Sequence, residues 1–171
     1  MGRFFLMIVL AAIISSCSYP INKVDVSTDK LITSKSIGTL NCSYRLLAIN
    51  DTRPEGTKAG GLGLNKLSFP EPQEYINVQL LKAGMLPANA TDGRPVTVDI
   101  KHVYLNQNNG SKIPTVVYEI QLDELDKFII RGQIASVNWN GSENEAYNAF
   151  AAAFQSANAQ LIARLNKSCV N

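Results

Sequence analysis

The sequence has little of the side-chain chemistry on which most enzymes depend. It contains one histidine, His102, together with three cysteines and one tryptophan in 171 residues. A triad hydrolase needs a histidine beside a positioned nucleophile, and a structural zinc site needs four nitrogen or sulfur ligands at characteristic spacing. Neither pattern surrounds His102, so we expect no catalytic residue, no metal site and no cofactor.

An excess of one charge is also missing. Sixteen Lys and Arg residues face 14 Asp and Glu residues, and the formal net charge is +2. Nucleic-acid-binding domains present a strongly basic patch, so we expect no nucleic-acid partner. The glycine-rich segment 56–65 is not a P-loop, because no Lys-Ser or Lys-Thr pair follows its last glycine at the start of a helix. We interpret this segment as a flexible loop.

The apolar run at the N-terminus is too short to cross a membrane. Phe4–Ile14 is eleven residues long and carries no charge, whereas a transmembrane helix needs about 20 apolar residues. Arg3 stands before the run and small residues stand after it. This is the layout of a secretory signal.

The end of the run, Ile14–Cys17 (Ile-Ser-Ser-Cys), resembles the bacterial lipobox, in which one aliphatic and two small residues precede an invariant cysteine. The resemblance implies that residues 1–16 are a lipoprotein signal peptide. Cys17 would then be the first mature residue and carry diacylglycerol and an N-acyl chain, and two or more acyl chains give a stable anchor. Ser18, where an aspartate would favour inner-membrane retention, implies the outer membrane of a Gram-negative bacterium, on the periplasmic side. An ordinary signal peptide with a chance cysteine, or a short buried helix, is the alternative.

Lipidation of Cys17 would leave an even pair of cysteines, Cys42 and Cys169. In an oxidising compartment such a pair usually forms a disulfide. The alternative is two free thiols. Residues 17–40 are polar with no strong period and predict a lipidated tether, and residues 41–171 predict one periplasmic α+β domain.

The hydrophobic pattern predicts the element order β-α-β-β-β-α. The apolar run 44–49 is typical of a central strand, and a helix begins near Pro72 and ends near Gly84. Three strands joined by turns follow, over residues 96–105, 115–122 and 127–139. Because consecutive strands with short turns are antiparallel, we expect a two-layer α+β sandwich. Its mainly antiparallel four-stranded sheet would carry two helices on one face.

Alternation along these strands predicts which side chains face the helices. Gly132 is expected at a bulge or a close-packing site. The final helix begins with a capping box, Ser142–Glu145. The predicted inward residues are Val96, Val98, Ile100, His102, Tyr104, Val116, Tyr118, Ile120, Leu122, Phe128, Ile130 and Ile134 on the strands, and Tyr147, Phe150, Phe154, Ala157, Leu161 and Leu165 on the final helix.

Several apolar residues before and within the first helix are not explained by this core. They either fold over the end of the sheet or offer a docking surface for a partner. These candidate partner-surface residues are Leu62, Leu64, Leu67, Phe69 and Tyr75.

The chain as a whole resembles small periplasm-facing lipoproteins of the YajG type. The resemblance rests on the lipobox, on the strand that runs into Asp51-Thr52-Arg53-Pro54, on the helix end LLKAGML before the strand VTVDI, and on the Ala-rich last helix. The lipopolysaccharide-assembly lipoprotein LptE has a similar element order, but its aromatic and Arg-containing start is missing after Cys17. Auxiliary lipoproteins of lipid-transporting ABC systems are a third relative in architecture. These resemblances imply no enzyme.

The sequence therefore predicts a non-enzymatic lipoprotein, held to the membrane by its N-terminal lipid, that contacts an envelope protein during envelope assembly or maintenance. One alternative is a module that binds a lipid or small apolar ligand, as in an auxiliary component of a lipid transport system. A hydrolase with an unrecognised site is the other.

Overall fold

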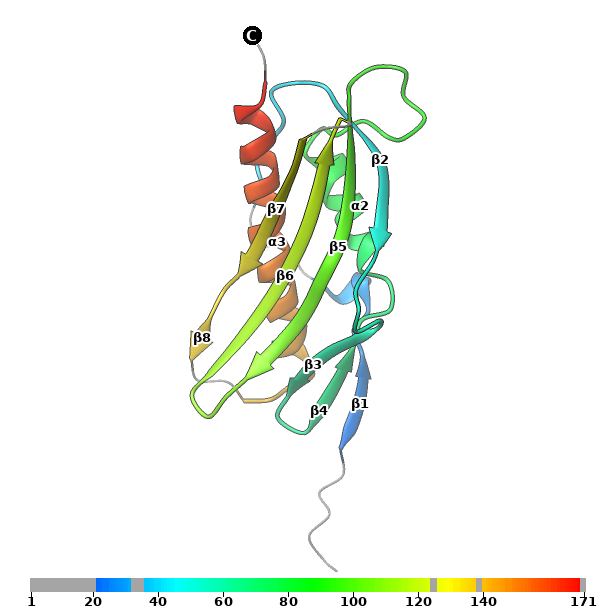
Figure 1. The fold of residues 1–171 in the computed structure, drawn as a ribbon. Helices are drawn as coiled ribbons and strands as arrows, with labels where there is room; N and C mark the ends of the chain where they lie inside the picture. The colour runs from blue at the N-terminus through cyan, green and yellow to red at the C-terminus, as the bar shows by residue number, and fades with distance from the viewer. Residues whose placement is uncertain (1–20, 32–35, 124–125, 138–139, 170–171) are drawn as a thin grey trace, which may run out of the picture.

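The computed structural model describes residues 21–31, 36–123, 126–137 and 140–169, so the predicted signal peptide and Cys17 lie outside it. Within these residues, eight strands form one mixed sheet, and the two α-helices lie on the same face of it (Figure 1). In chain order the elements are β1 (Asn22–Asp25), the 3-10 helix η1 (Thr28–Lys30), β2 (Tyr44–Asp51), β3 (Lys58–Leu62), β4 (Asn65–Ser68), α2 (Pro72–Lys82), β5 (Arg94–Gln107), β6 (Ser111–Leu122), β7 (Asp126–Gln133), β8 (Ser136–Val137) and α3 (Glu143–Lys167).

This sheet contradicts the predicted four-stranded antiparallel sheet and the predicted order β-α-β-β-β-α. Strands β5, β6 and β7 form an antiparallel meander, but β2 runs parallel to β5. A parallel neighbour requires a crossover connection, and the chain between β2 and β5 supplies one by carrying α2 across the sheet face. An apolar run indicates a strand but not its direction, which is why the prediction was wrong.

Strands β1, β3 and β4 lie at one end of the sheet and were not predicted. β1 pairs in parallel with β4, and β4 pairs antiparallel with β3. β3 meets β5 at the single pair Gly60 and Leu105. A Cβ at Gly60 would lie 2.1 Å from the Leu105 carbonyl oxygen, so only glycine permits this approach. β1 falls within the segment 17–40 that was predicted as a tether, and its Val24 is buried, so the folded domain begins near Asn22.

A β-bulge in β5 changes which side chains face the helices. The register with β6 shifts between Ile100 and His102, and one extra residue reverses the alternation beyond it. Val103 is therefore buried, whereas His102 and Tyr104 are half-exposed on the opposite face. The predicted inward placement of His102 and Tyr104 is wrong, because alternation was carried through the bulge unchanged.

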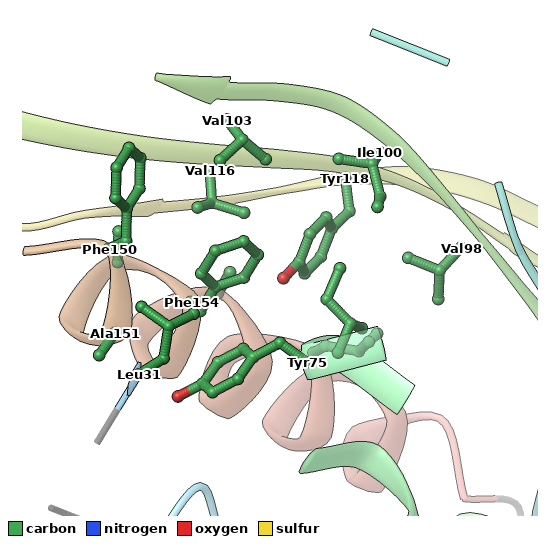
Figure 2. Close-up of a cluster of buried hydrophobic side chains, with 14 of the residues drawn as sticks. Leu31, Tyr75, Val98, Ile100, Val103, Val116, Tyr118, Phe150, Ala151 and Phe154 are labelled. Carbon is green, nitrogen blue, oxygen red and sulfur yellow. The ribbon is translucent and has the colours of Figure 1, made fainter. Parts of the chain in front are cut away.

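Aromatic side chains fill the space between sheet and helices (Figure 2). The ring of Phe69 packs edge-to-face against Phe150 and Phe154, with both pairs of ring centroids 5.5 Å apart. The Tyr118 hydroxyl donates to Oδ1 of Asn158 at 3.1 Å, and burial raises the pKa of this phenol. A buried polar group needs such a partner, so this hydrogen bond specifies how α3 sits on β6.

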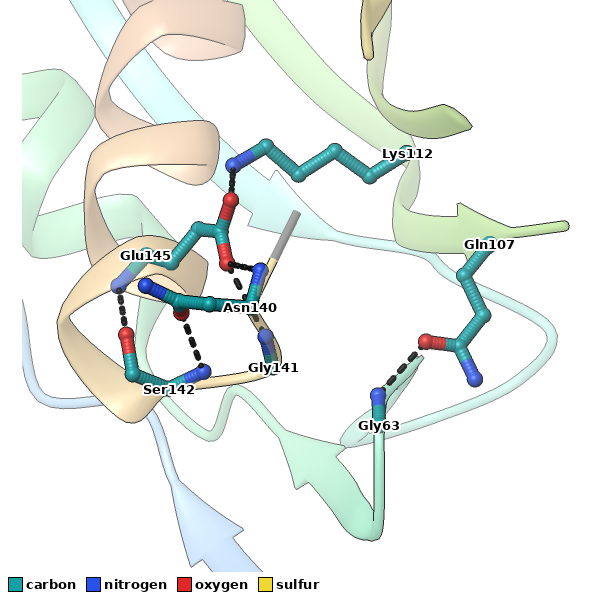
Figure 3. A network of polar contacts seen from close by, with 7 residues as sticks. All are labelled: Gly63, Gln107, Lys112, Asn140, Gly141, Ser142 and Glu145. Carbon is teal, nitrogen blue, oxygen red and sulfur yellow. Dashed lines mark hydrogen bonds and ion pairs between the residues drawn. The ribbon is translucent and has the colours of Figure 1, made fainter. Parts of the chain in front are cut away.

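Helix α3 begins at the predicted capping box. The Ser142 hydroxyl accepts from the Glu145 backbone N–H at 3.3 Å. The Glu145 carboxylate accepts from the backbone N–H groups of Asn140 and Gly141 at 2.7 and 3.0 Å, and it pairs with Lys112 of β6 (Figure 3). Desolvation raises the pKa of Glu145, but Lys112 and the two N–H groups lower it by more. The six predicted inward residues of α3 are buried.

Helix α3 approaches β7 closely at Gly132. A Cβ at this position would lie 2.1 Å from the Ala153 carbonyl oxygen and 2.5 Å from the Ala157 nitrogen. The prediction of a close-packing site here is confirmed. Ile134, which was expected to face inward, is exposed just beyond the end of β7.

A disulfide joins Cys42 to Cys169, as the cysteine count predicts. It ties the chain just before β2 to the end of α3. The Tyr44 hydroxyl donates to the Leu165 carbonyl at 2.7 Å, and the side chain of Asn166 accepts from a backbone N–H of the loop before β2 at 2.8 Å. The C-terminus of α3 is thus held to that loop and to the start of β2 by a covalent bond and by hydrogen bonds.

The contact at Gly132 predicts a large effect of adding one methyl group. In Gly132→Ala, the new Cβ meets backbone atoms of α3 that cannot rotate away, so the helix must move. Overpacking of this kind costs about 3 kcal/mol of unfolding free energy, measurable by urea denaturation. Gly110→Ala is the matched control, because nothing lies within 4 Å of a Cβ built there. Equal stability of the two variants would contradict the contact.

Candidate functional site

Strand β2 lies at an open edge of the sheet (Figure 1). β5 pairs with one side of it. On the other side, Leu86 bonds to Tyr44 and Leu46, and beyond that point no other strand among the described residues pairs with β2. Unpaired edge strands offer backbone N–H and C=O groups to an added strand.

A groove of about 440 Å³ runs between β2 and α2. It is mainly apolar, with Leu46, Leu47 and Ile49 of β2, Leu81 of α2, and Pro87 after α2 among its lining residues. Leu47 is 45% exposed. Gln73, Glu74 and Asn77 add polar groups along α2. A groove with apolar walls and a few polar groups, next to an open strand edge, fits an extended peptide.

A second bulge lies in β2 at the exposed Leu47. The register of β2 against β5 shifts between Leu46 and Ala48, so Leu47 is the extra residue. Bulges are common at sheet edges, where they redirect a side chain. The prediction that 44–49 is a central strand is wrong, because one edge of β2 is open. A continuous apolar run contains no signal for the bulge.

The five residues predicted as a partner surface do not form one. Only Leu64, in the turn between β3 and β4, is exposed. The other four pack into the core because β3, β4 and α2 fold over the sheet, which was the alternative stated for them. These buried residues are Leu62, Leu67, Phe69 and Tyr75.

His102 lies on the face of the sheet that the helices leave uncovered. Its Nδ1 is 3.0 Å from a carboxylate oxygen of Glu55, and its ring stacks on Tyr104 with centroids 5.5 Å apart. Among the described residues it makes no hydrogen bond to a serine or cysteine. The same part of the chain contains no group of three His, Cys, Asp or Glu residues placed to hold a metal ion. The contact between His102 and Glu55 holds the loop after β2 against β5.

An ion pair with a buried arginine fixes the end of β2. Arg53 donates to both carboxylate oxygens of Asp51 at 2.7 and 2.6 Å and to the Phe69 carbonyl at 2.8 Å. The Arg53 side chain is fully buried. Partial burial raises the pKa of Asp51, but the hydrogen bonds and charge of Arg53 lower it by more. The pair connects the end of β2 to the chain entering α2.

The predicted lipid site, Cys17, lies outside the described residues. None of the helices in the described part of the chain is long and apolar enough to span a membrane. Sequence reasoning missed the groove, because its walls come from segments 46–49, 73–81 and 87–88, which are brought together by tertiary contacts such as the parallel pairing of β2 with β5.

No family model matches this chain, and no curated protein matches it. A solved structure from Xanthomonas campestris, a protein of the family DUF330, is similar with a TM-score of 0.51 and 11% identity over 85% of this chain and 92% of its own. A minor lipoprotein from Acinetobacter baumannii matches with a TM-score of 0.44 and 12% identity over 74% and 94%. The first likeness shows that this fold is shared. Neither match points to the YajG type.

The Asp51–Arg53 pair predicts a pH-dependent stability. Because folding lowers the pKa of Asp51, the pair stabilises the protein above the unfolded pKa, and this contribution is lost as the pH falls. Asp51→Asn leaves a buried cation without its counter-charge and should cost about 3 kcal/mol at neutral pH. Urea unfolding should show that the difference in unfolding free energy between Asp51→Asn and wild type disappears below about pH 4. Asp92→Asn, in an exposed loop, should match wild type throughout; a gap for Asp51→Asn that is unchanged in acid would refute the account.

Proposed function

We propose that this chain is a bacterial lipoprotein, anchored by Cys17 in the outer membrane and facing the periplasm, that acts through protein contacts and not through catalysis. The observation that carries the anchor is the sequence Ile14–Cys17 at the end of an apolar run too short to span a bilayer. The disulfide between Cys42 and Cys169 agrees with an oxidising compartment. We also propose that the chain is a lipoprotein of the YajG type, on the sequence resemblance described above.

The groove beside β2 is the surface that we assign to the partner. Strand addition to β2 would satisfy its outer backbone groups, and alternate side chains of the added segment would rest on Leu47 and Leu81. A lipid could cover the same apolar walls, but it would leave the strand edge unpaired. This difference favours a protein segment over an apolar ligand, and contact with an envelope protein during envelope assembly or maintenance is the role that follows.

Crosslinking in intact bacterial envelopes tests this role with a matched pair of variants. Leu47→Asp puts a charge into the groove, whereas Ile129→Asp changes an apolar side chain on β7 that is at least as accessible, at 58% exposed. We expect wild type and Ile129→Asp to crosslink the same envelope protein, and Leu47→Asp to lose at least tenfold of that yield, equivalent to about 1.4 kcal/mol.

Two results would count against the role. One is the absence of any crosslinked envelope protein above background, and the other is a crosslink that Leu47→Asp leaves unchanged. Native mass spectrometry of the same samples addresses the alternative. If wild type binds a lipid in stoichiometric amount and Leu47→Asp does not, the groove binds an apolar ligand and the proposal of a protein partner is wrong.

A further inference from the structure

One end of the molecule, the lower end in Figure 1, gathers the start of β1, the β3–β4 turn, the β5–β6 turn and the start of α3. The end of α3 lies at the opposite, upper end. The described chain starts at the lower end, and the proposed lipid site is only a few residues before that start.

Hydrogen bonds join the segments of the lower end. The Asn22 backbone N–H donates to the Leu64 carbonyl at 3.0 Å, so the start of β1 is held to the β3–β4 turn. The Gly63 N–H donates to the Gln107 side chain at 2.6 Å and links the two turns (Figure 3). Asn65 donates to the loop before α3 at 2.8 Å. The lower end therefore presents its side chains from a connected framework.

Two apolar and two basic side chains lie together there. Ile21 is 57% exposed and Leu64 is 49% exposed. Lys23 and Lys66 are direct partners across β1 and β4, and both are exposed. Like charges placed opposite each other are unfavourable, and among the described residues neither lysine forms an ion pair. We call Ile21, Leu64, Lys23 and Lys66 the proximal face.

The short chain between Cys17 and the proximal face limits how far this face can lie from the lipid on Cys17. Three residues lie between Cys17 and Ile21, and the four Cα–Cα steps that join these two residues span at most about 14 Å when fully extended. Helix α3 alone, with 25 residues, is about 37 Å long. A lipid on Cys17 would therefore hold the proximal face close to the bilayer surface, and the domain could not turn its other end toward that surface.

We propose that the proximal face docks on the bilayer that holds the Cys17 lipid, with Ile21 and Leu64 entering the headgroup region and Lys23 and Lys66 contacting anionic headgroups. This inference rests on the proposed lipid anchor. Apolar side chains flanked by basic residues are the composition of interfacial membrane-binding surfaces. Docking would fix the orientation of the domain, so that the groove beside β2 stands at a set height above the membrane.

The experiment uses the lipidated full-length protein and compares a fluorescent reporter at the lower end of the folded molecule with one at the upper end. Asn109→Cys, in the β5–β6 turn, and Asn89→Cys, in the loop before β5, are both exposed asparagines. Each is labelled with a polarity-sensitive dye, and the protein is reconstituted into vesicles of phosphatidylethanolamine and phosphatidylglycerol that contain brominated lipid. Intact-mass measurement of the same samples establishes whether Cys17 carries lipid.

We expect the dye at position 109 to be quenched several-fold more than the dye at position 89. Ile21→Asp with Leu64→Asp should lower the quenching at position 109 and so shrink the difference, because only the short link to Cys17 then holds this end near the bilayer. The control Ile129→Asp should keep the full difference. Lys23→Glu with Lys66→Glu should weaken quenching on these vesicles but not on uncharged phosphatidylcholine vesicles.

Equal quenching at the two positions of a lipidated chain would overturn the docking and leave the lipoprotein proposal intact. So would a difference that Ile21→Asp with Leu64→Asp leaves unchanged in size. A chain purified from membranes without lipid on Cys17 would overturn both proposals. Circular dichroism of the exposed-site variants shows that they are folded in each comparison.

Discussion

The contact of α3 with the sheet is the interaction on which the rest of the structure depends. At Gly132 the backbone of β7 meets the backbone of α3 with no room for a Cβ, and this allows Phe150 and Phe154 to reach Phe69 under the sheet. The two ends of α3 are then fixed separately. Glu145 binds Lys112 at its start, and the disulfide of Cys169 holds its end. A long rigid helix thus connects the lower end of the molecule to the upper end.

The strands that were not predicted place the start of the folded domain at its lower end. β1 begins at Asn22, a few residues after Cys17, and pairs with β4, so the proximal face lies close to Cys17 along the chain. The groove beside β2 opens on the side of the sheet, at an edge that no described strand covers. The proposed anchor, the proximal face and the groove are separate parts of the chain. If Cys17 carries lipid, a domain of this form would hold a partner segment at a defined distance from the membrane.

The sequence predicts the helices and the main strands better than it predicts which strands pair and in which direction. The apolar stripe of α3, its capping box, Gly132 and the disulfide could be read from local pattern or composition. The parallel pairing of β2 with β5, the two bulges and the short strands β1, β3 and β4 could not. Each of these is decided by tertiary contact, since a single bulge at Ile100–His102 is enough to turn His102 and Tyr104 outward. The groove was missed for the same reason, because its walls are distant in the sequence.

The central claim is that Cys17 carries the lipid that places the domain at a membrane. The most direct test is the intact mass of the full chain, produced in a Gram-negative bacterium and purified from its membranes. The account predicts a chain that begins at Cys17, lacks residues 1–16 and carries the added mass of diacylglycerol and one N-acyl chain. A chain that keeps residues 1–16, or one cleaved at another position and free of lipid, would contradict it.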